Sequence, residues 1–171
     1  KHEVADLVDY ARSYGFEVIP EVQSLGHVQY ITAAYPEIAE TEEEVKSTAV
    51  VDLKKEDMPP DKFYKDSYCP SRENSYSIIF DLIDEIVEVV RPSRYVHMGH
   101  DEVYTMGTCP LCKDKDHSDL YASDVNKLYN YLTSKNLKMM IWGDMLHNVT
   151  KYKTPPAIGK IPKDIVLLDF I

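Results

Sequence analysis

Amphipathic helical patterns alternate with short apolar runs along this chain, and this alternation constrains its fold more than any other feature. The runs predicted as buried strands are Phe16–Val22, Tyr95–Met98, Lys138–Trp142 and Ile165–Phe170. Apolar residues at helical spacing lie before and between them, near residues 4–11, 76–90 and 121–132. Strands and helices that alternate at this spacing predict parallel βα units.

Local signals indicate where these elements begin and end. Gly15 can close the first helix, and Ser71 is expected to cap the N-terminus of the second, which ends at Pro92. The segment from about Thr41 to Tyr68 is rich in acidic residues, Lys and Pro, and it is predicted to be a loop.

Polar residues follow each predicted strand at its C-terminal end. They are Gln23 to His27, Gly99 to Glu102, Gly143 to Asp144, and Asp169. In α/β folds this edge carries the active site, and the lack of a Gly-rich phosphate loop favours a barrel over a nucleotide-binding sheet. A complete (β/α)₈ barrel takes about 250 residues. The chain is therefore predicted to be an α/β protein, a partial (β/α)₈ TIM barrel with outer helices, forming a single domain over residues 1–171.

Charge and hydropathy exclude several classes of partner. The net charge of −10 argues against binding to nucleic acid and to anionic membranes, since both require a basic surface. No apolar run approaches the roughly 20 residues needed to span a bilayer. The first residue is Lys rather than Met, so we expect the chain to be a piece of a longer protein.

The stretch from Tyr95 to Tyr104 is the most informative candidate for a site. Its apolar start and its Gly99 predict a buried strand that ends in the adjacent carboxylates Asp101 and Glu102. Two neighbouring carboxylates repel each other, and holding both in a cleft costs free energy unless they act there. A solvated acidic loop end is the alternative, and the flanking His97 favours a site.

Five motifs together give the chain a family resemblance. They are Glu-Val-Ile-Pro-Glu-Val-Gln-Ser-Leu-Gly-His27, Tyr-Pro-Glu37, Cys-Pro-Ser71, His97-Met-Gly-His-Asp-Glu102 and Ile-Trp-Gly-Asp144. In this order they resemble the catalytic domain of family 20 glycoside hydrolases, the β-N-acetylhexosaminidases. The resemblance covers the third to sixth strands of that family's barrel. Two positions depart from its pattern: His100 replaces a Gly, and Gln23 replaces an Asp.

The resemblance implies a glycosidase that removes terminal β-linked N-acetylglucosamine or N-acetylgalactosamine, without a cofactor or a catalytic metal. In this family the substrate's own 2-acetamido oxygen attacks the anomeric carbon, so no enzymic nucleophile is needed. Glu102 is then the general acid, and Asp101 orients the acetamide. The remaining barrel strands of the parent chain are expected partners, and the isolated piece is expected to be inactive without them.

Further pocket residues are also implied by the resemblance. Trp142 would form a wall around the acetamido group, His27 would support the catalytic carboxylates, and Gln23 would assist them. Asp144 is interpreted as either an acceptor for sugar hydroxyls or a loop cap. His97 has the same strand parity as Gly99 and Asp101, and it is predicted to be a packed, hydrogen-bonded core histidine that supports the site.

Two other functions compete with this hypothesis. His27, His97, His100 and Asp101 could together bind the metal of a barrel hydrolase. The parity of the strand argues against this set, because His97 and His100 should point to opposite faces, with His100 toward the helix layer. The chain could also be a non-catalytic carbohydrate-binding or structural fragment of a barrel.

The three cysteines suggest a separate structural feature. Cys109 and Cys112 have CxxC spacing, His117 follows five residues later, and Cys69 precedes another helix at the same end of the barrel. Four such ligands could hold a structural zinc ion. A reduced pair or a local disulfide in a surface loop is the alternative.

Overall fold

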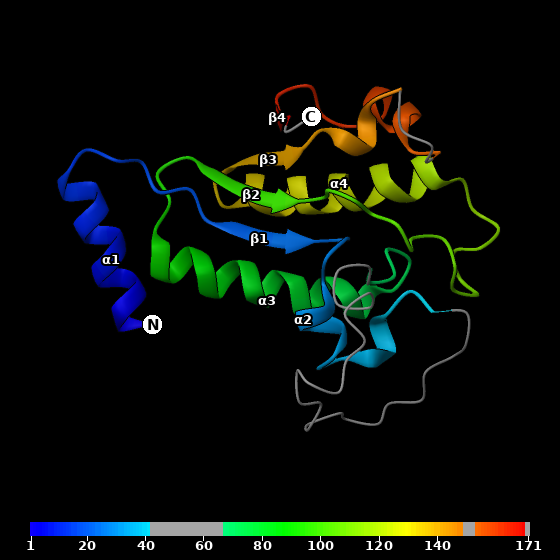
Figure 1. The fold of residues 1–171 in the computed structure, drawn as a ribbon, viewed down its shortest axis with the longest axis horizontal. Coiled ribbons are helices and arrows are strands. Elements are labelled where there is room, and N and C mark those ends of the chain that lie inside the picture. Colours follow the sequence, from blue (N-terminus) through cyan, green and yellow to red (C-terminus); the bar gives the residue numbers. More distant parts are fainter. Residues whose placement is uncertain (42–66, 149–152, 170–171) are drawn as a thin grey trace.

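The computed structural model describes residues 1–41, 67–148 and 153–169, and its central feature in these ranges is a parallel sheet. The strands β1 (Glu21–Ser24), β2 (Tyr95–Gly99), β3 (Lys138–Trp142) and β4 (Val166–Leu168) are paired in chain order. All three pairings are parallel, so the C-terminal ends of the strands lie at one edge (Figure 1). The predicted partial barrel with parallel strands is confirmed.

Helices cover the sheet and build the core. The long helices are α1 (His2–Ser13), α3 (Glu73–Val90) and α4 (His117–Ser134), and α2 (Gln29–Thr32) is a single turn. Short 3₁₀ turns occur at η1 (Pro36–Ile38), η3 (Asp144–Leu146) and η4 (Pro155–Gly159). Helix α3 packs against β1, and α4 packs against β3 (Figure 1). Fully buried residues of both helices and of the strands meet in this layer: Ile79, Ile83, Val96, Met98, Val125, Leu128, Leu132, Met139 and Ile141.

None of the helices in the described ranges is both long and apolar enough to cross a lipid bilayer.

Strand β1 begins later than predicted. The run from Phe16 was expected to be buried strand, but Phe16 is 67% exposed and the ladder with β2 starts only at the carbonyl of Pro20, which accepts from His97 N–H. Pro20 has no N–H to donate, so regular pairing cannot extend back through it. At the other end of the sheet, β4 stops at Leu168, and Phe170 lies outside the described residues.

The predicted helix ends were partly right. Tyr14 ends α1 and Gly15 follows with φ +82°, as expected of a glycine after a helix C-terminus. Ser71 is not the N-cap of α3; that position is Arg72, without a side-chain cap. Ser71 Oγ instead accepts a hydrogen bond from Lys115 Nζ at 2.8 Å. Most of the predicted 41–68 loop lies outside the described residues, while Tyr68 forms an isolated antiparallel bridge with Ala39.

Candidate active site

Two adjacent carboxylates and one histidine meet beyond the C-terminal end of β2. Nε2 of His27 lies 3.4 Å from Asp101 Oδ2 and 3.2 Å from Glu102 Oε2. The Asp101 side chain is 19% exposed, and that of Glu102 is 44% exposed. One carboxylate is thus enclosed by protein, while its neighbour opens toward solvent and remains accessible to a substrate.

The backbone on both sides of this contact adopts left-handed conformations. After β2, His100 has φ +74° and Glu102 has φ +46°; in the loop after β1, Leu25 has φ +62° and His27 has φ +54°. Residues other than glycine adopt such angles only when the surrounding structure imposes them, and these angles concentrate at functional sites. Strand alternation therefore stops at Gly99. Beyond this point the side chains of both Asp101 and Glu102 reach His27.

Gln23 holds the enclosed carboxylate. Its Nε2 donates to Asp101 Oδ1 at 2.6 Å, from the neighbouring strand β1. A Cβ on Gly99 would lie 2.5 Å from Gln23 Oε1, and a Cβ on Gly26 would lie 2.7 Å from the carbonyl oxygen of Asp101. Both glycines let β1, β2 and their loops approach closely enough to form this bond.

Asp144 joins the site from the end of β3. Its Oδ2 accepts a hydrogen bond from the backbone N–H of Glu102 at 3.0 Å. Burial raises the pKa of this carboxyl, and the charge on Asp101 raises it further. The contact corresponds to the loop-capping alternative, and it fixes the backbone of Glu102 from the β3 side.

His97 on β2 and Trp142 on the neighbouring strand β3 pack together. The Nδ1 atom of His97 accepts from Gly99 N–H at 3.1 Å and lies 3.5 Å from Glu21 Oε1, so the ring is packed and hydrogen-bonded in the manner predicted. Its ring centroid is 4.9 Å from that of Trp142, with the planes tilted by 61°. The neighbouring His97 ring lowers the pKa of the Glu21 carboxyl. Trp142 is half-buried at the C-terminal end of β3.

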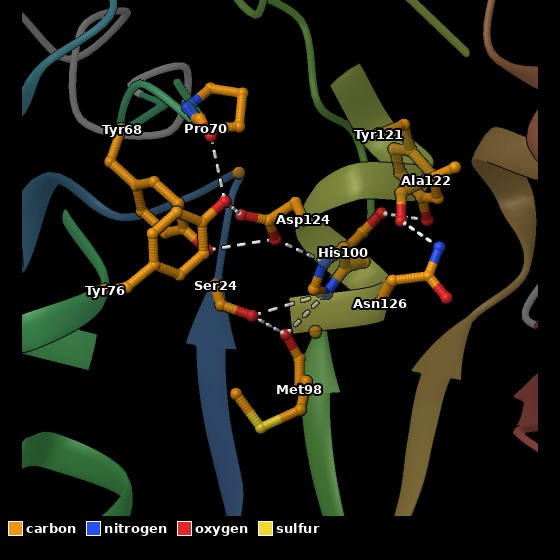
Figure 2. A network of polar contacts seen from close by, with 12 residues as sticks. Ser24, Tyr68, Pro70, Tyr76, Met98, His100, Tyr121, Ala122, Asp124 and Asn126 are labelled. Carbon is orange, nitrogen blue, oxygen red and sulfur yellow. Dashed lines mark hydrogen bonds and ion pairs between the residues drawn. The ribbon is translucent and has the colours of Figure 1, made fainter. Parts of the chain in front are cut away.

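His100 faces the opposite way and belongs to a buried polar network, which Figure 2 shows. Its Nε2 lies 2.9 Å from Asp124 Oδ2, and both side chains are fully buried. Tyr68 Oη donates to Asp124 Oδ2 at 3.0 Å, and Tyr76 Oη donates to Asp124 Oδ1 at 2.8 Å. Ser24 Oγ is 3.3 Å from His100 Nδ1. Burial raises the pKa of both tyrosines, which therefore act as neutral donors.

The contacts of His97 and His100 rule out the metal set considered from the sequence, and they reveal a residue that the sequence analysis missed. The proposed metal set of His27, His97, His100 and Asp101 is not assembled, because His97 pairs with Glu21 and His100 pairs with Asp124. Asp124 itself was missed by sequence reasoning. The signal available was an acidic residue on the apolar face of the α4 helix.

Comparison with known proteins places the chain in a family. The family description "Glycosyl hydrolase family 20, catalytic domain" matches residues 1–165. The chain belongs to glycosyl hydrolase family 20.

Relatives and solved structures agree with this assignment. The chain is 31% identical over 119 residues to a beta-hexosaminidase of Akkermansia muciniphila, covering 67% of this chain and 22% of the relative. It is 26% identical over 155 residues to a beta-hexosaminidase of Porphyromonas gingivalis, covering 85% of this chain and 18% of the relative. The chain thus spans about a fifth of the length of these relatives.

The fold matches two solved structures. The beta-N-acetylhexosaminidase of Bacteroides fragilis superposes with a TM-score of 0.70 at 22% identity, over 98% of this chain and 30% of that one. The exo beta-N-acetylglucosaminidase of Vibrio harveyi, solved with N-acetylglucosamine, gives a TM-score of 0.71 at 20% identity, over 99% of this chain and 25% of that one.

Proposed function

We propose that this chain carries the acid–base and acetamide-binding half of a β-N-acetylhexosaminidase that works by substrate assistance. The observation that supports this most directly is the meeting of Asp101 and Glu102 at His27, with unequal exposure. Glu102, the more open of the two, is the general acid. Asp101, held by Gln23 and His27, is the fixed carboxylate that orients the substrate's acetamide.

The proposed reaction passes through a bicyclic intermediate. The acetamide carbonyl oxygen attacks the anomeric carbon while the bond to the leaving oxygen breaks, and Glu102 gives its proton to that oxygen. Positive charge develops on the acetamide nitrogen, and the carboxylate of Asp101 accepts the N–H and stabilises that charge. Glu102 then takes a proton from a water molecule, whose oxygen attacks the anomeric carbon and reopens the ring with retained configuration.

Neighbouring residues are assigned supporting roles in this proposal. Trp142 offers an indole face to the apolar side and methyl group of the sugar. Asp144 positions the Glu102 backbone, and in this proposal it also accepts a sugar hydroxyl. His97 packs against the indole, and His27 contacts both carboxylates and fixes their relative position.

The active protein also needs barrel strands beyond the four described here. Within the described residues, β1 and β4 are the outer strands of the sheet, and Phe16 and Ile19 beside β1 are exposed. Unpaired edges with apolar neighbours are normally covered in a stable protein. We propose that further strands of the parent chain cover both edges and complete the sugar pocket.

The test separates substrate assistance from an enzymic nucleophile, using the full open reading frame that contains this sequence. Asp101→Asn should slow hydrolysis of N-acetylated substrates, and it should weaken binding of a thiazoline mimic of the intermediate, because a neutral amide cannot stabilise the developing cation. A glucoside without the 2-acetamido group should be a very poor substrate for the wild type.

Asp81→Asn, an exposed change on α3, is the matched control and should leave both readouts unchanged. Covalent labelling of Asp101 or of another carboxylate by a mechanism-based fluorosugar would show that the proposed mechanism is wrong.

A further inference from the structure

Three cysteines and one glutamate come together in a buried cluster at the same end of the sheet. Cys69 precedes α3, Cys109 and Cys112 lie between β2 and α4, and Glu40 follows η1. Cys69 and Cys112 are completely buried, Cys109 is 1% exposed and Glu40 is 6% exposed. Segments far apart in the sequence thus contribute three thiols and one carboxylate to one buried cluster.

The distances fit a metal ion better than a disulfide. Cys69 Sγ lies 3.4 Å from Cys109 Sγ and 3.5 Å from Cys112 Sγ. One ligand atom from each of the three cysteines and from Glu40 lies within 4.8 Å of all the others. A tetrahedral zinc with Zn–S bonds of about 2.3 Å places its sulfurs about 3.8 Å apart, whereas a disulfide needs about 2.05 Å. Cys69 is also almost equally close to both partners, so the distances favour neither pair for oxidation.

Glu40 brings a carboxylate group into the same buried place. Its Oε2 accepts from Cys109 N–H at 2.8 Å, and its Oε1 accepts from Gly107 N–H at 3.3 Å. Among the described residues it makes no ion pair with a Lys, Arg or His. A carboxylate oxygen this close to three thiol groups completes a set of ligands that zinc accepts.

We propose that Glu40, Cys69, Cys109 and Cys112 bind one structural zinc ion. Three sulfurs and one carboxylate oxygen form a closed four-ligand set of the kind that zinc adopts in structural sites. The sequence had suggested His117 as the fourth ligand, and this was wrong: its ring lies against Gly107, and Glu40 takes the fourth position. The CxxC turn supports the geometry, since the N–H groups of Cys112 and Lys113 both bond to the Cys109 carbonyl at 2.9 Å.

The proposed ion would join three loops and reach the active-site strand through one chain of contacts. Ser75 Oγ at the start of α3 donates to the carbonyl of Cys69 at 2.9 Å. Tyr68, the residue before Cys69, donates to Asp124, which contacts His100, the residue before Asp101. Zinc here would stabilise the loops that surround the site, and it would take no part in the chemistry.

The experiment measures metal in the full-length protein, purified under reducing conditions without added chelator. Elemental analysis should give about one zinc per chain, as expected for a closed structural site. Replacement by Co²⁺ should produce the intense sulfur-to-cobalt absorption and the visible bands of tetrahedral coordination. A strong chelator should lower the melting temperature of the wild type, and added zinc should restore it.

Variants then assign the ligands. Cys109→Ser and Glu40→Gln should each lose most of the bound metal, and the change at Glu40 keeps an acceptor for the two backbone N–H groups. His117→Asn is the matched control and should retain about one zinc per chain. Retention of metal by Glu40→Gln together with loss in His117→Asn would overturn the ligand assignment.

The wild type alone keeps the proposal testable if a variant fails to fold. Metal-free wild-type protein with three titratable thiols, or with a disulfide among them, and a melting temperature that the chelator does not change would overturn the site. A cobalt spectrum without sulfur charge transfer would do the same.

Discussion

Two histidine–carboxylate contacts flank the C-terminal end of β2, and their surroundings are opposite. His27 meets Asp101 and Glu102 at the rim, where the two carboxylate side chains are 19% and 44% exposed. His100 meets Asp124 at 2.9 Å between the sheet and α4, where both side chains are fully buried. Histidine and carboxylate side chains therefore meet in two different environments, and the adjacent residues His100 and Asp101 belong one to each.

The difference between them lies in how completely each carboxylate is satisfied. Asp124 accepts from His100, Tyr68 and Tyr76, so its lone pairs are committed within the protein (Figure 2). Glu102 has one histidine contact and a face open to solvent. A buried polar group that is fully bonded stabilises the fold, whereas a carboxyl with free capacity near a cleft can exchange a proton with a substrate. The comparison predicts that chemistry depends on the rim pair and stability on the buried pair.

The largest expected effect is a loss of turnover when Glu102, at the rim, is replaced. Glu102→Gln removes the proposed proton donor, and turnover on substrates with poor leaving groups should fall by about 10²–10⁴-fold, the usual contribution of a general acid. An activated aryl glycoside needs less protonation and should lose much less. Steady-state kinetics on both substrate types, with the exposed Glu88→Gln as control, make the measurement. Equal losses on both substrates would remove Glu102 from the role of acid.

The buried pair should affect stability more than chemistry. Asp124→Leu leaves His100 and the Tyr68 hydroxyl without this partner, while the Tyr76 hydroxyl keeps the Pro70 carbonyl. Breaking a buried pair in this way costs about 3–5 kcal/mol of unfolding free energy. Turnover per folded molecule should fall less than in Glu102→Gln. Denaturant unfolding and active-site titration measure the two quantities.

A double variant sharpens this point. Glycine tolerates the φ of +74° found at position 100. His100→Gly combined with Asp124→Leu should therefore be less destabilised than the sum of the two single changes. Strict additivity would mean that the two side chains do not act as a pair.

The smallest effect, a change in the free energy of unfolding, is expected at Asp144, a buried carboxyl that contacts the backbone of Glu102. Its pKa is raised by burial, so the folded state binds its proton more tightly than the unfolded state does, and ionisation at neutral pH opposes folding. Asp144→Asn should be at least as stable as the wild type at pH 7. That advantage should disappear as the pH falls through the folded pKa, since the wild-type carboxyl is then neutral as well. Urea unfolding at several pH values tests the sign; an advantage that grows in acid would contradict it.

The sequence by itself determined the parallel βα order and the rim on which the site lies. Alternating apolar patterns are local, and the C-terminal ends of parallel strands must share an edge, so β3 was predicted with its observed bounds, Lys138–Trp142. Strand parity also placed His100 toward the helix layer, away from His97. These inferences needed only the period of a strand and the direction of its pairing.

Only the tertiary structure decided which side chains meet. The left-handed backbone at His100 and Glu102 turns both catalytic candidates toward His27, and a strand pattern contains no signal for such a turn. Asp124 and Glu40 gained their partners from segments 24 to 69 residues away along the chain. Contacts at that separation arise from the packing of helices and loops around the sheet. The entropic cost of closing such loops depends only weakly on their length, so distance along the sequence does not reveal which residues will meet.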